Sequence, residues 1–169
     1  TMAAHLNLGI TLLNAADLTS AEKALASGLA QSRKRQDLAL TAAFLGNIGN
    51  VYANQNNLSR SLAAFRDARA IYQKLPRPIG EAESLGNIGM VYFLRSELDS
   101  AQTALKDALK INREIDYPRG QAQDLDRLGT VYILRGELDS ALTSYQAALD
   151  INRKIGYRNG EGRVLGNIG

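Results

Sequence analysis

The 169-residue chain contains no cysteine, no tryptophan, one histidine and three prolines. Without cysteine, disulfides and thiol chemistry are excluded. The single histidine, His5, does not belong to any group of residues with metal-ligand spacing, and no glycine-rich phosphate-binding loop follows a strand. We therefore predict a protein that is not an enzyme, with no catalytic residue, no metal site and no cofactor.

The net charge of the chain is small, and its runs of apolar residues are short. Twenty Lys and Arg against 17 Asp and Glu leave a net charge of +3, and the densest basic run, residues 33–35, is too short for a strong nucleic-acid signal. No apolar run approaches the roughly 20 residues that a membrane span requires. We predict no nucleic-acid partner and no membrane partner, and expect the protein in the cytoplasm.

What the sequence does contain is a repeated motif. The motif Leu-Gly-Asn-Ile-Gly-x-Val-Tyr occurs at residues 85–92 and recurs at 45–52, in altered form at 125–132, and in part at 165–169. Residues 85–124 and 125–164 are identical at 20 of 40 positions. The last glycine of the motif recurs every 40 residues, at Gly9, Gly49, Gly89, Gly129 and Gly169. An internal repeat of this length predicts an array in which each unit packs on its neighbours.

Each repeat is predicted to hold two helices. The apolar spacing indicates helices at 2–15, 19–34, 38–55, 59–75, 80–95, 99–115, 120–135, 139–155 and 160–169. Asp99 and Asp139 are predicted N-caps of the second helices. Proline and glycine residues are predicted to form the joints between repeats; these are Pro76, Pro78, Pro118, Gly80, Gly120 and Gly160. The units are about 1–39, 40–79, 80–119, 120–159 and a partial 160–169, forming one array over residues 1–169 that we expect to be an excerpt of a longer protein.

Small residues recur at fixed positions in both helices of the repeat. Glycine inside a helix costs about 1 kcal/mol relative to alanine. Because Gly49, Gly89 and Gly129 recur all the same, we predict that they allow two helices to approach closely, beside large residues such as Phe65 and Tyr145.

These features resemble the tetratricopeptide repeat family. The resemblance covers essentially the whole chain and is carried by Leu-Gly-x-x-Tyr in the first helix and by small residues such as Ala101 and Ala108 in the second. The 40-residue period and the Leu-Gly-Asn motif are similar to Pins/LGN-type adaptors and to bacterial signalling arrays. The resemblance implies an all-α fold, a right-handed superhelical solenoid of antiparallel helix hairpins whose first helices line a concave groove.

The groove positions follow from helical geometry at about 100° per residue, on the face of each first helix opposite the buried one. The predicted peptide-binding groove contains Asn47, Asn50, Asn54, Asn87, Met90, Leu94, Arg127, Thr130, Leu134 and Asn167. An asparagine amide both donates and accepts, so a ladder of asparagines suits an extended peptide backbone. The alternative is that these asparagines bridge neighbouring helices or are only solvated. Three positions also match a family carboxylate clamp, Asn50, Asn87 and Arg127, but its two lysine positions hold Gly46 and Gln123.

The function predicted from these patterns is that of a scaffold or adaptor that binds a protein or peptide in its concave groove. One alternative is a regulatory or sensory arm of a larger enzyme or transcription regulator. Another is a self-assembling scaffold, because Leu165 and Ile168 form an apolar side at the end of the array, and self-association through such ends is expected.

Overall fold

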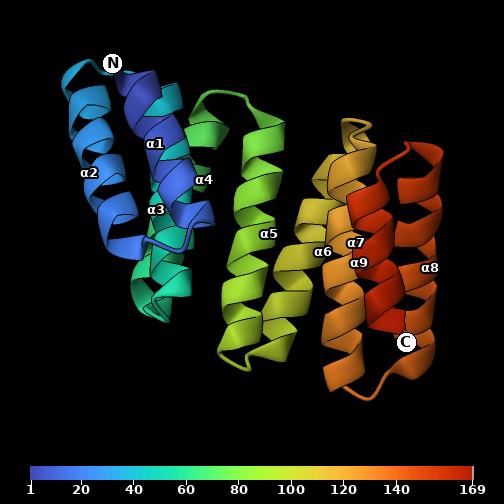
Figure 1. Ribbon diagram of the computed structural model, residues 1–169. Coiled ribbons are helices and arrows are strands. Elements are labelled where there is room, and N and C mark those ends of the chain that lie inside the picture. The colour runs from blue at the N-terminus through green and yellow to red at the C-terminus, as the bar shows by residue number, and fades with distance from the viewer. Residues whose placement is uncertain (169) are drawn as a thin grey trace. The chain divides into compact units, whose positions relative to one another are not determined.

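The computed structural model describes residues 1–168, which form nine helices and no strand (Figure 1). The helices are α1 Met2–Asn14, α2 Leu18–Lys34, α3 Leu38–Asn54, α4 Leu58–Lys74, α5 Pro78–Leu94, α6 Leu98–Glu114, α7 Pro118–Leu134, α8 Leu138–Lys154 and α9 Arg158–Ile168. From α2 onward a helix begins every 20 residues, so two helices make one 40-residue repeat. The predicted all-α helical-repeat fold is confirmed, although most predicted helices began one or two residues too late.

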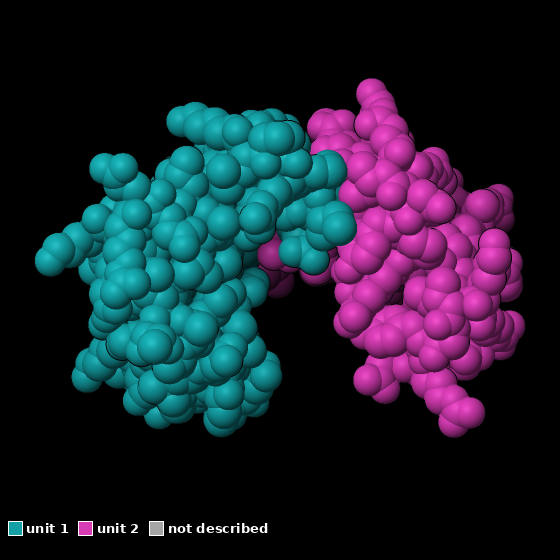
Figure 2. Space-filling view, turned by 90° about the horizontal axis from the view of Figure 1, so that it is seen from above, with its two compact units in different colours: residues 1–84 teal, residues 85–169 magenta. Residues whose placement is uncertain are grey.

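The chain divides into two compact units, residues 1–84 and 85–169 (Figure 2). In unit 1, α1 packs on α2 and α3 on α4, while α3 also contacts α1 and α2. In unit 2, α7 packs on α6, α8 and α9, and α8 packs on α9. Each unit has its own apolar core: Phe44 and Leu25 lie at the centre of the first, and Leu105 and Tyr145 at the centre of the second.

Every helix connection is a three-residue link. The middle residue has a positive φ in seven of the links, at Ala16, Gln36, Asn56, Ser96, Asp116, Gly136 and Gly156, with φ between 48° and 75°. In the first link the N–H of Ala16 donates to Leu13 O and the N–H of Asp17 donates to Leu12 O, and the same pattern recurs along the chain. This pair of bonds is the Schellman motif, which satisfies carbonyl groups at a helix C-terminus.

The predicted caps and joints need correction. The N-cap residues of α6 and α8 are Glu97 and Glu137, and neither makes a side-chain capping bond. Asp99 and Asp139 lie inside the first turn instead. Shorter side chains do cap the earlier helices, at Asp17, Asp37 and Asn57. Glutamate at the same link position is one methylene longer and does not form this bond.

Of the predicted joint residues, Pro76 does lie in a link, between α4 and α5, whereas the other prolines and the glycines lie within helices. Pro78 and Pro118 are the first residues of α5 and α7, where a proline has no helical hydrogen bond to lose. Gly80, Gly120 and Gly160 are the third residues of their helices. A Cβ at Gly120 would lie 2.6 Å from the Asn112 side chain, so this glycine serves close packing rather than a turn.

Gly9, Gly49, Gly89 and Gly129 lie in close contact with a neighbouring helix, as predicted for the last three; Gly169 lies outside the described residues. A Cβ at Gly49 would lie 2.7 Å from the Phe65 ring, and one at Gly129 would lie 2.5 Å from the Tyr145 ring. At Gly49 the backbone also takes part, because the hydroxyl of Ser61 donates to Gly49 O at 2.8 Å. The large side chain sixteen residues later therefore fills the space that the glycine leaves open.

Gly89→Leu is expected to destabilise unit 2. A Cβ at Gly89 would lie 2.7 Å from Leu105 Cγ and 3.3 Å from the backbone oxygen of Ala101, and Leu105 is fully buried. Overpacking a core costs typically about 1–3 kcal/mol, so we expect a lower melting temperature in thermal unfolding. Gly162→Leu is the matched control, because nothing lies within 4 Å of a Cβ there. Equal melting of Gly89→Leu and wild type would show that the crossing can relax without cost.

Candidate protein-binding face

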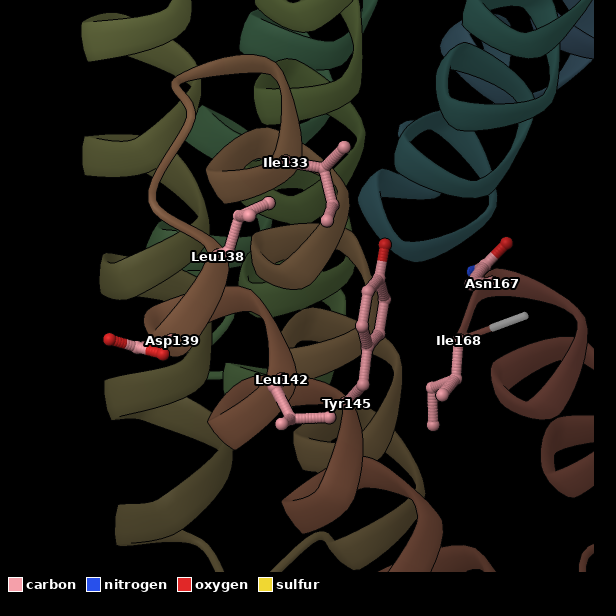
Figure 3. A pocket seen from close by; sticks show the side chains of 7 residues that line it. All are labelled: Ile133, Leu138, Asp139, Leu142, Tyr145, Asn167 and Ile168. Carbon is pink, nitrogen blue, oxygen red and sulfur yellow. The ribbon is translucent and has the colours of Figure 1, made fainter.

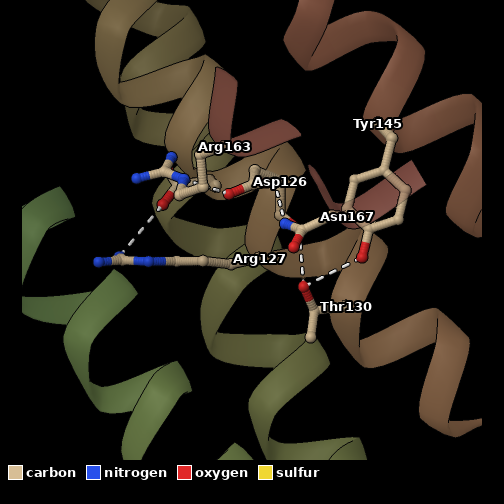
Figure 4. Close-up of polar contacts among 7 residues, drawn as sticks. Asp126, Arg127, Thr130, Tyr145, Arg163 and Asn167 are labelled. Carbon is tan, nitrogen blue, oxygen red and sulfur yellow. Dashed lines mark hydrogen bonds and ion pairs between the residues drawn. The ribbon is translucent and has the colours of Figure 1, made fainter. Parts of the chain in front are cut away.

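One face of α7 in unit 2, which we call the inner face, carries Asp126, Arg127 and Thr130, and these residues belong to a polar network (Figure 4). Asp126 is 4% exposed and accepts two hydrogen bonds from α9, one from Arg163 Nε at 2.7 Å and one from Asn167 Nδ2 at 2.9 Å. Both oxygens of this buried carboxylate are therefore occupied, one of them by a charged donor. Hydrogen bonds to charged groups contribute more than neutral ones, so this pair of bonds fixes α9 against α7.

The next residue, Arg127, points toward α5. Its Nη2 donates to Asn87 Oδ1 at 3.3 Å. A Cβ at Gly86 would lie 2.5 Å from Arg127 Nη1, so the guanidinium occupies space that any side chain at position 86 would need. Glycine at this position therefore lets Arg127 lie against the α5 backbone while its side chain keeps 29% of its surface exposed.

Thr130 continues the row one turn further along α7. Its hydroxyl donates to Asp126 O at 3.2 Å and lies 3.1 Å from the hydroxyl of Tyr145 on α8. Tyr145 is 3% exposed, so its ring belongs to the core while its hydroxyl reaches the inner face. Thr130 thus links the network on α7 to the second helix of the same repeat.

A second carboxylate, Asp124, lies deeper, between α6 and α7. It is 3% exposed, accepts a 2.7 Å hydrogen bond from Asn112 Nδ2, and lies 4.0 Å from Arg127 Nη1. Burial raises the pKa of Asp124 to about 7, and the Asn112 hydrogen bond and the Arg127 charge only partly oppose this. Near neutral pH this carboxyl is therefore protonated in part of the molecules and charged in the rest.

In unit 1 the predicted asparagines lie along α3, and the side chains of two of them bond to their own helix. Asn47 Nδ2 donates to Ala43 O at 2.9 Å, and Asn54 Nδ2 donates to Asn50 O at 2.8 Å. Asn47 and Asn50 are half-buried, whereas Asn54 is exposed. Nothing lies within 4 Å of a Cβ at Gly46, one residue before Asn47, so this part of the α3 surface is open.

The ten predicted groove residues thus fall into three sets. Asn87, Arg127, Thr130 and Asn167 take part in the unit 2 network through bonds between helices. On α3, the side chains of Asn47 and Asn54 bond to their own helix, and Asn50 accepts from Asn54 through its backbone oxygen. Met90 is half-buried, and Leu94 and Leu134 are 53% and 59% exposed. The sequence did not lead us to predict Asp126, the acceptor that joins α7 to α9. The signal that could have found it is that the equivalent position of the other repeats holds glycine, at residues 46, 86 and 166.

A hollow of about 250 Å³ lies beside the same network, among α7, α8 and α9 (Figure 3). It is lined by Ile133, Leu138, Asp139, Leu142, Tyr145, Asn167 and Ile168. Leu138 and Leu142 are 64% and 57% exposed, and Leu165 and Ile168 are also exposed, as predicted for this end of the repeat array. Self-association through this surface remains a prediction.

Within residues 1–168, no three His, Asp or Glu side chains group closely enough to hold a metal ion. None of the helices in this part of the chain is both long and apolar enough to cross a bilayer.

The sequence matches models of a known protein family. A tetratricopeptide repeat model matches residues 40–114, and a second tetratricopeptide repeat model matches residues 125–155. Together these matches span more than half of the chain. No curated protein sequence matches the chain significantly.

Solved structures share the fold at low sequence identity. The Rap conjugation gene regulator of plasmid pLS20, solved with a Phr peptide, has a TM-score of 0.86 and 16% identity over 96% of this chain and 45% of its own. BtubC (BKLC) from P. vanneervenii has a TM-score of 0.80 and 18% identity over 92% of this chain and 65% of its own.

A third structure, the TPR-like repeats of a putative kinesin light chain from Podosopora anserina, has a TM-score of 0.70 and 14% identity over 97% of this chain and 91% of its own. The chain thus spans about half to two thirds of the length of the Rap regulator and BtubC. The repeat pattern, the paired helices and the family models lead to one conclusion: this protein–protein interaction module belongs to the tetratricopeptide repeat family.

Proposed function

We propose that unit 2 binds an extended peptide or protein segment along the inner face of α7. The observation that carries this proposal is the row of Arg127, Thr130 and Leu134 on that face. It combines a partly exposed guanidinium, a hydroxyl and a leucine that is 59% exposed. Leu94 stands one repeat earlier, at the position equivalent to Leu134, and is 53% exposed.

The chemistry of this face suits a peptide better than an apolar small molecule. Arg127 and Asn87 offer donors and an acceptor that fit main-chain carbonyl and amide groups. The two leucines offer apolar contact to side chains that extend from the same peptide. A peptide held by main-chain bonds and selected by side-chain contacts is a common mode of recognition.

The inner face is also rigid before a ligand arrives. Asp126 accepts bonds from both Arg163 and Asn167, so the residues around Arg127 are already ordered by contacts between repeats. Ordering these side chains on binding would therefore cost less conformational entropy. The fold neighbour solved with a Phr peptide supports a peptide ligand for this fold.

Unit 1 offers a second, smaller candidate surface on α3. Asn47 and Asn54 use their amide N–H groups for bonds to their own helix, so their carbonyl oxygens are the groups left to accept bonds from a ligand. Asn50 lies between them on the same face, and we include it in the proposal as a third polar contact.

Arg127→Glu and Asn87→Ala are expected to weaken peptide binding without loss of helix. Each removes a polar side chain that the proposal places against the peptide, and loss of a specific hydrogen bond to a polar or charged group costs about 1–3 kcal/mol. The measurement is the affinity for peptides that were selected from a displayed random library on the wild-type chain. Circular dichroism checks the helix content of each variant.

Lys154→Glu serves as the matched charge control, because Lys154 is exposed in the last turn of α8. It should bind the selected peptides as wild type does. If Arg127→Glu and Asn87→Ala also bind them with unchanged affinity, the peptide site lies elsewhere on the chain.

A further inference from the structure

A separate cavity opens on the side of α7 that faces away from the polar network. It has a volume of about 420 Å³ and lies among α6, α7 and α8. It is lined by Lys106, Leu109, Lys110, Arg113, Glu114, Leu125, Leu128, Tyr132 and Ser144. Leu125, Leu128 and Tyr132 follow one side of α7, and at 100° per residue the opposite side carries Arg127 and Thr130.

The floor of this cavity is apolar and fixed. Leu109, Leu125 and Leu128 are 6%, 8% and 3% exposed, so they belong to the packed core and cannot move aside. Tyr132 is half-buried beside them. The volume of the cavity falls in the range of about 300–1,000 Å³ that is typical of ligand-binding pockets. The cavity is therefore preformed for a large apolar side chain.

One rim of the cavity is basic. Lys106, Lys110 and Arg113 stand at i, i+4 and i+7 on α6, which places them in one row about 10 Å long. The only acidic lining residue, Glu114, lies 4.0 Å from Lys110, and both side chains are more than 60% exposed, so their pairing is weak. Three cations against one anion leave a local excess of two positive charges.

The repeat itself does not require these cations. Forty residues earlier the three positions hold Arg66, Ala70 and Gln73, and forty residues later they hold Gln146, Asp150 and Arg153. The floor, in contrast, is kept as Leu85, Ile88 and Tyr92 one repeat earlier. Residues 85–168 contain 11 Lys and Arg and 11 Asp and Glu, so the basic row is also not a consequence of a basic unit.

We infer that this cavity is a second docking site, whose ligand is an acidic peptide segment with a large apolar anchor. The anchor would enter over Leu125 and Leu128, and carboxylates beside it would meet Lys106, Lys110 and Arg113. Side chains on one face of an extended peptide recur about every 6.6–6.8 Å, close to the 6 Å rise between residues i and i+4 of a helix. An apolar floor favours a peptide over nucleic acid, whose backbone offers phosphates but no such anchor.

The test measures fluorescence anisotropy of a labelled peptide, Glu-Glu-Asp-Leu-Phe-Asp-Glu-Glu, titrated with the full chain. The wild type is expected to bind saturably. The Lys106→Glu/Arg113→Glu variant is expected to bind at least about ten-fold more weakly, because it reverses both ends of the basic row. In that variant both new glutamates keep Lys110 as a helical neighbour, which limits any effect on folding.

Three controls make the result specific. Lys23→Glu/Arg33→Glu changes the net charge equally at exposed residues of α2, and should bind within about two-fold of wild type. Lys154→Glu, at an exposed residue of α8 outside the lining of the cavity, should also bind nearly as wild type, which shows that the peptide depends on the basic row and not on any exposed lysine of unit 2. A peptide with serines in place of Leu-Phe should bind at least about ten-fold more weakly, because its apolar anchor is missing.

Several results would overturn the inference. They are no saturable binding up to about 1 mM, equal loss in the α2 control variant, and equal binding of the serine peptide. Tighter binding of an oligothymidylate of the same length, lost in Lys106→Glu/Arg113→Glu, would reassign the basic row to nucleic acid.

Discussion

At pH 8 the Asp124→Asn variant is expected to unfold at a higher denaturant concentration than wild type. Asp124 is 3% exposed, and burial raises its pKa to about 7 from an ordinary value of 3.8. A shift of roughly three pKa units corresponds to about 4 kcal/mol, since each unit is worth 1.36 kcal/mol. Asparagine has almost the same shape, carries no charge, and keeps a carbonyl oxygen that can accept the Asn112 amide.

The direction follows from where the proton is held. Because the folded-state pKa is raised, the native state binds the proton more tightly than the unfolded chain does. The resulting stability is fully present below about pH 4 and is lost as the pH rises through about 7. The free energy of unfolding of unit 2 should therefore fall over this window in wild type relative to Asp124→Asn.

The measurement is urea unfolding at several pH values between 4 and 8, with the difference between the two proteins plotted against pH. Asp107→Asn is the control, since it makes the same chemical change at an exposed residue of α6. A constant difference between wild type and Asp124→Asn across the window would mean that folding does not raise the pKa of Asp124.

The helices and their close crossings could be predicted from sequence because each depends on a repeated local pattern. The glycine column at residues 49, 89 and 129 recurs with a large side chain sixteen residues later, and the structure places each such pair in contact. The links could not be placed as well. Glu97 and Asp99 are both acidic residues beside a leucine, and only the backbone shows which of them precedes the helix.

The polar network was harder to predict for a different reason. Its bonds join residues about one repeat apart, such as Asp126 with Arg163 and Asn87 with Arg127. The 40-residue period indicates that such residues are neighbours, but not which of them are charged partners. Asp126 replaces a glycine of the repeat, so a reading based on what the repeats share overlooks it.

In unit 1, Gly28 and Phe44 differ from the residues at the equivalent positions of the other repeats, and this pair leads to a prediction about core packing. The column at 28, 68, 108 and 148 reads Gly, Ala, Ala, Ala, and the column at 44, 84, 124 and 164 reads Phe, Ser, Asp, Val. Where the second column has its largest residue, the first has its smallest. The structure explains this, because a Cβ at Gly28 would lie 2.2 Å from Phe44 Cζ and Phe44 is fully buried.

Phe44→Ala is expected to cost roughly 3–5 kcal/mol of unfolding free energy, as for other buried phenylalanines cut to alanine. Gly28→Ala alone is expected to cost about 1–3 kcal/mol, because the new methyl group overpacks the Phe44 ring. In the Phe44→Ala background the same change should instead stabilise the protein. There the ring is gone, and alanine is favoured over glycine inside a helix by about 1 kcal/mol.

The cycle is measured by urea unfolding of wild type, both single variants and the double variant. Gly46→Ala is the matched control: it makes the same chemical change inside α3, where nothing lies within 4 Å of the new Cβ, so it should stabilise rather than destabilise. A double variant whose loss equals the sum of the two single losses would mean that Gly28 and Phe44 do not compete for the same space.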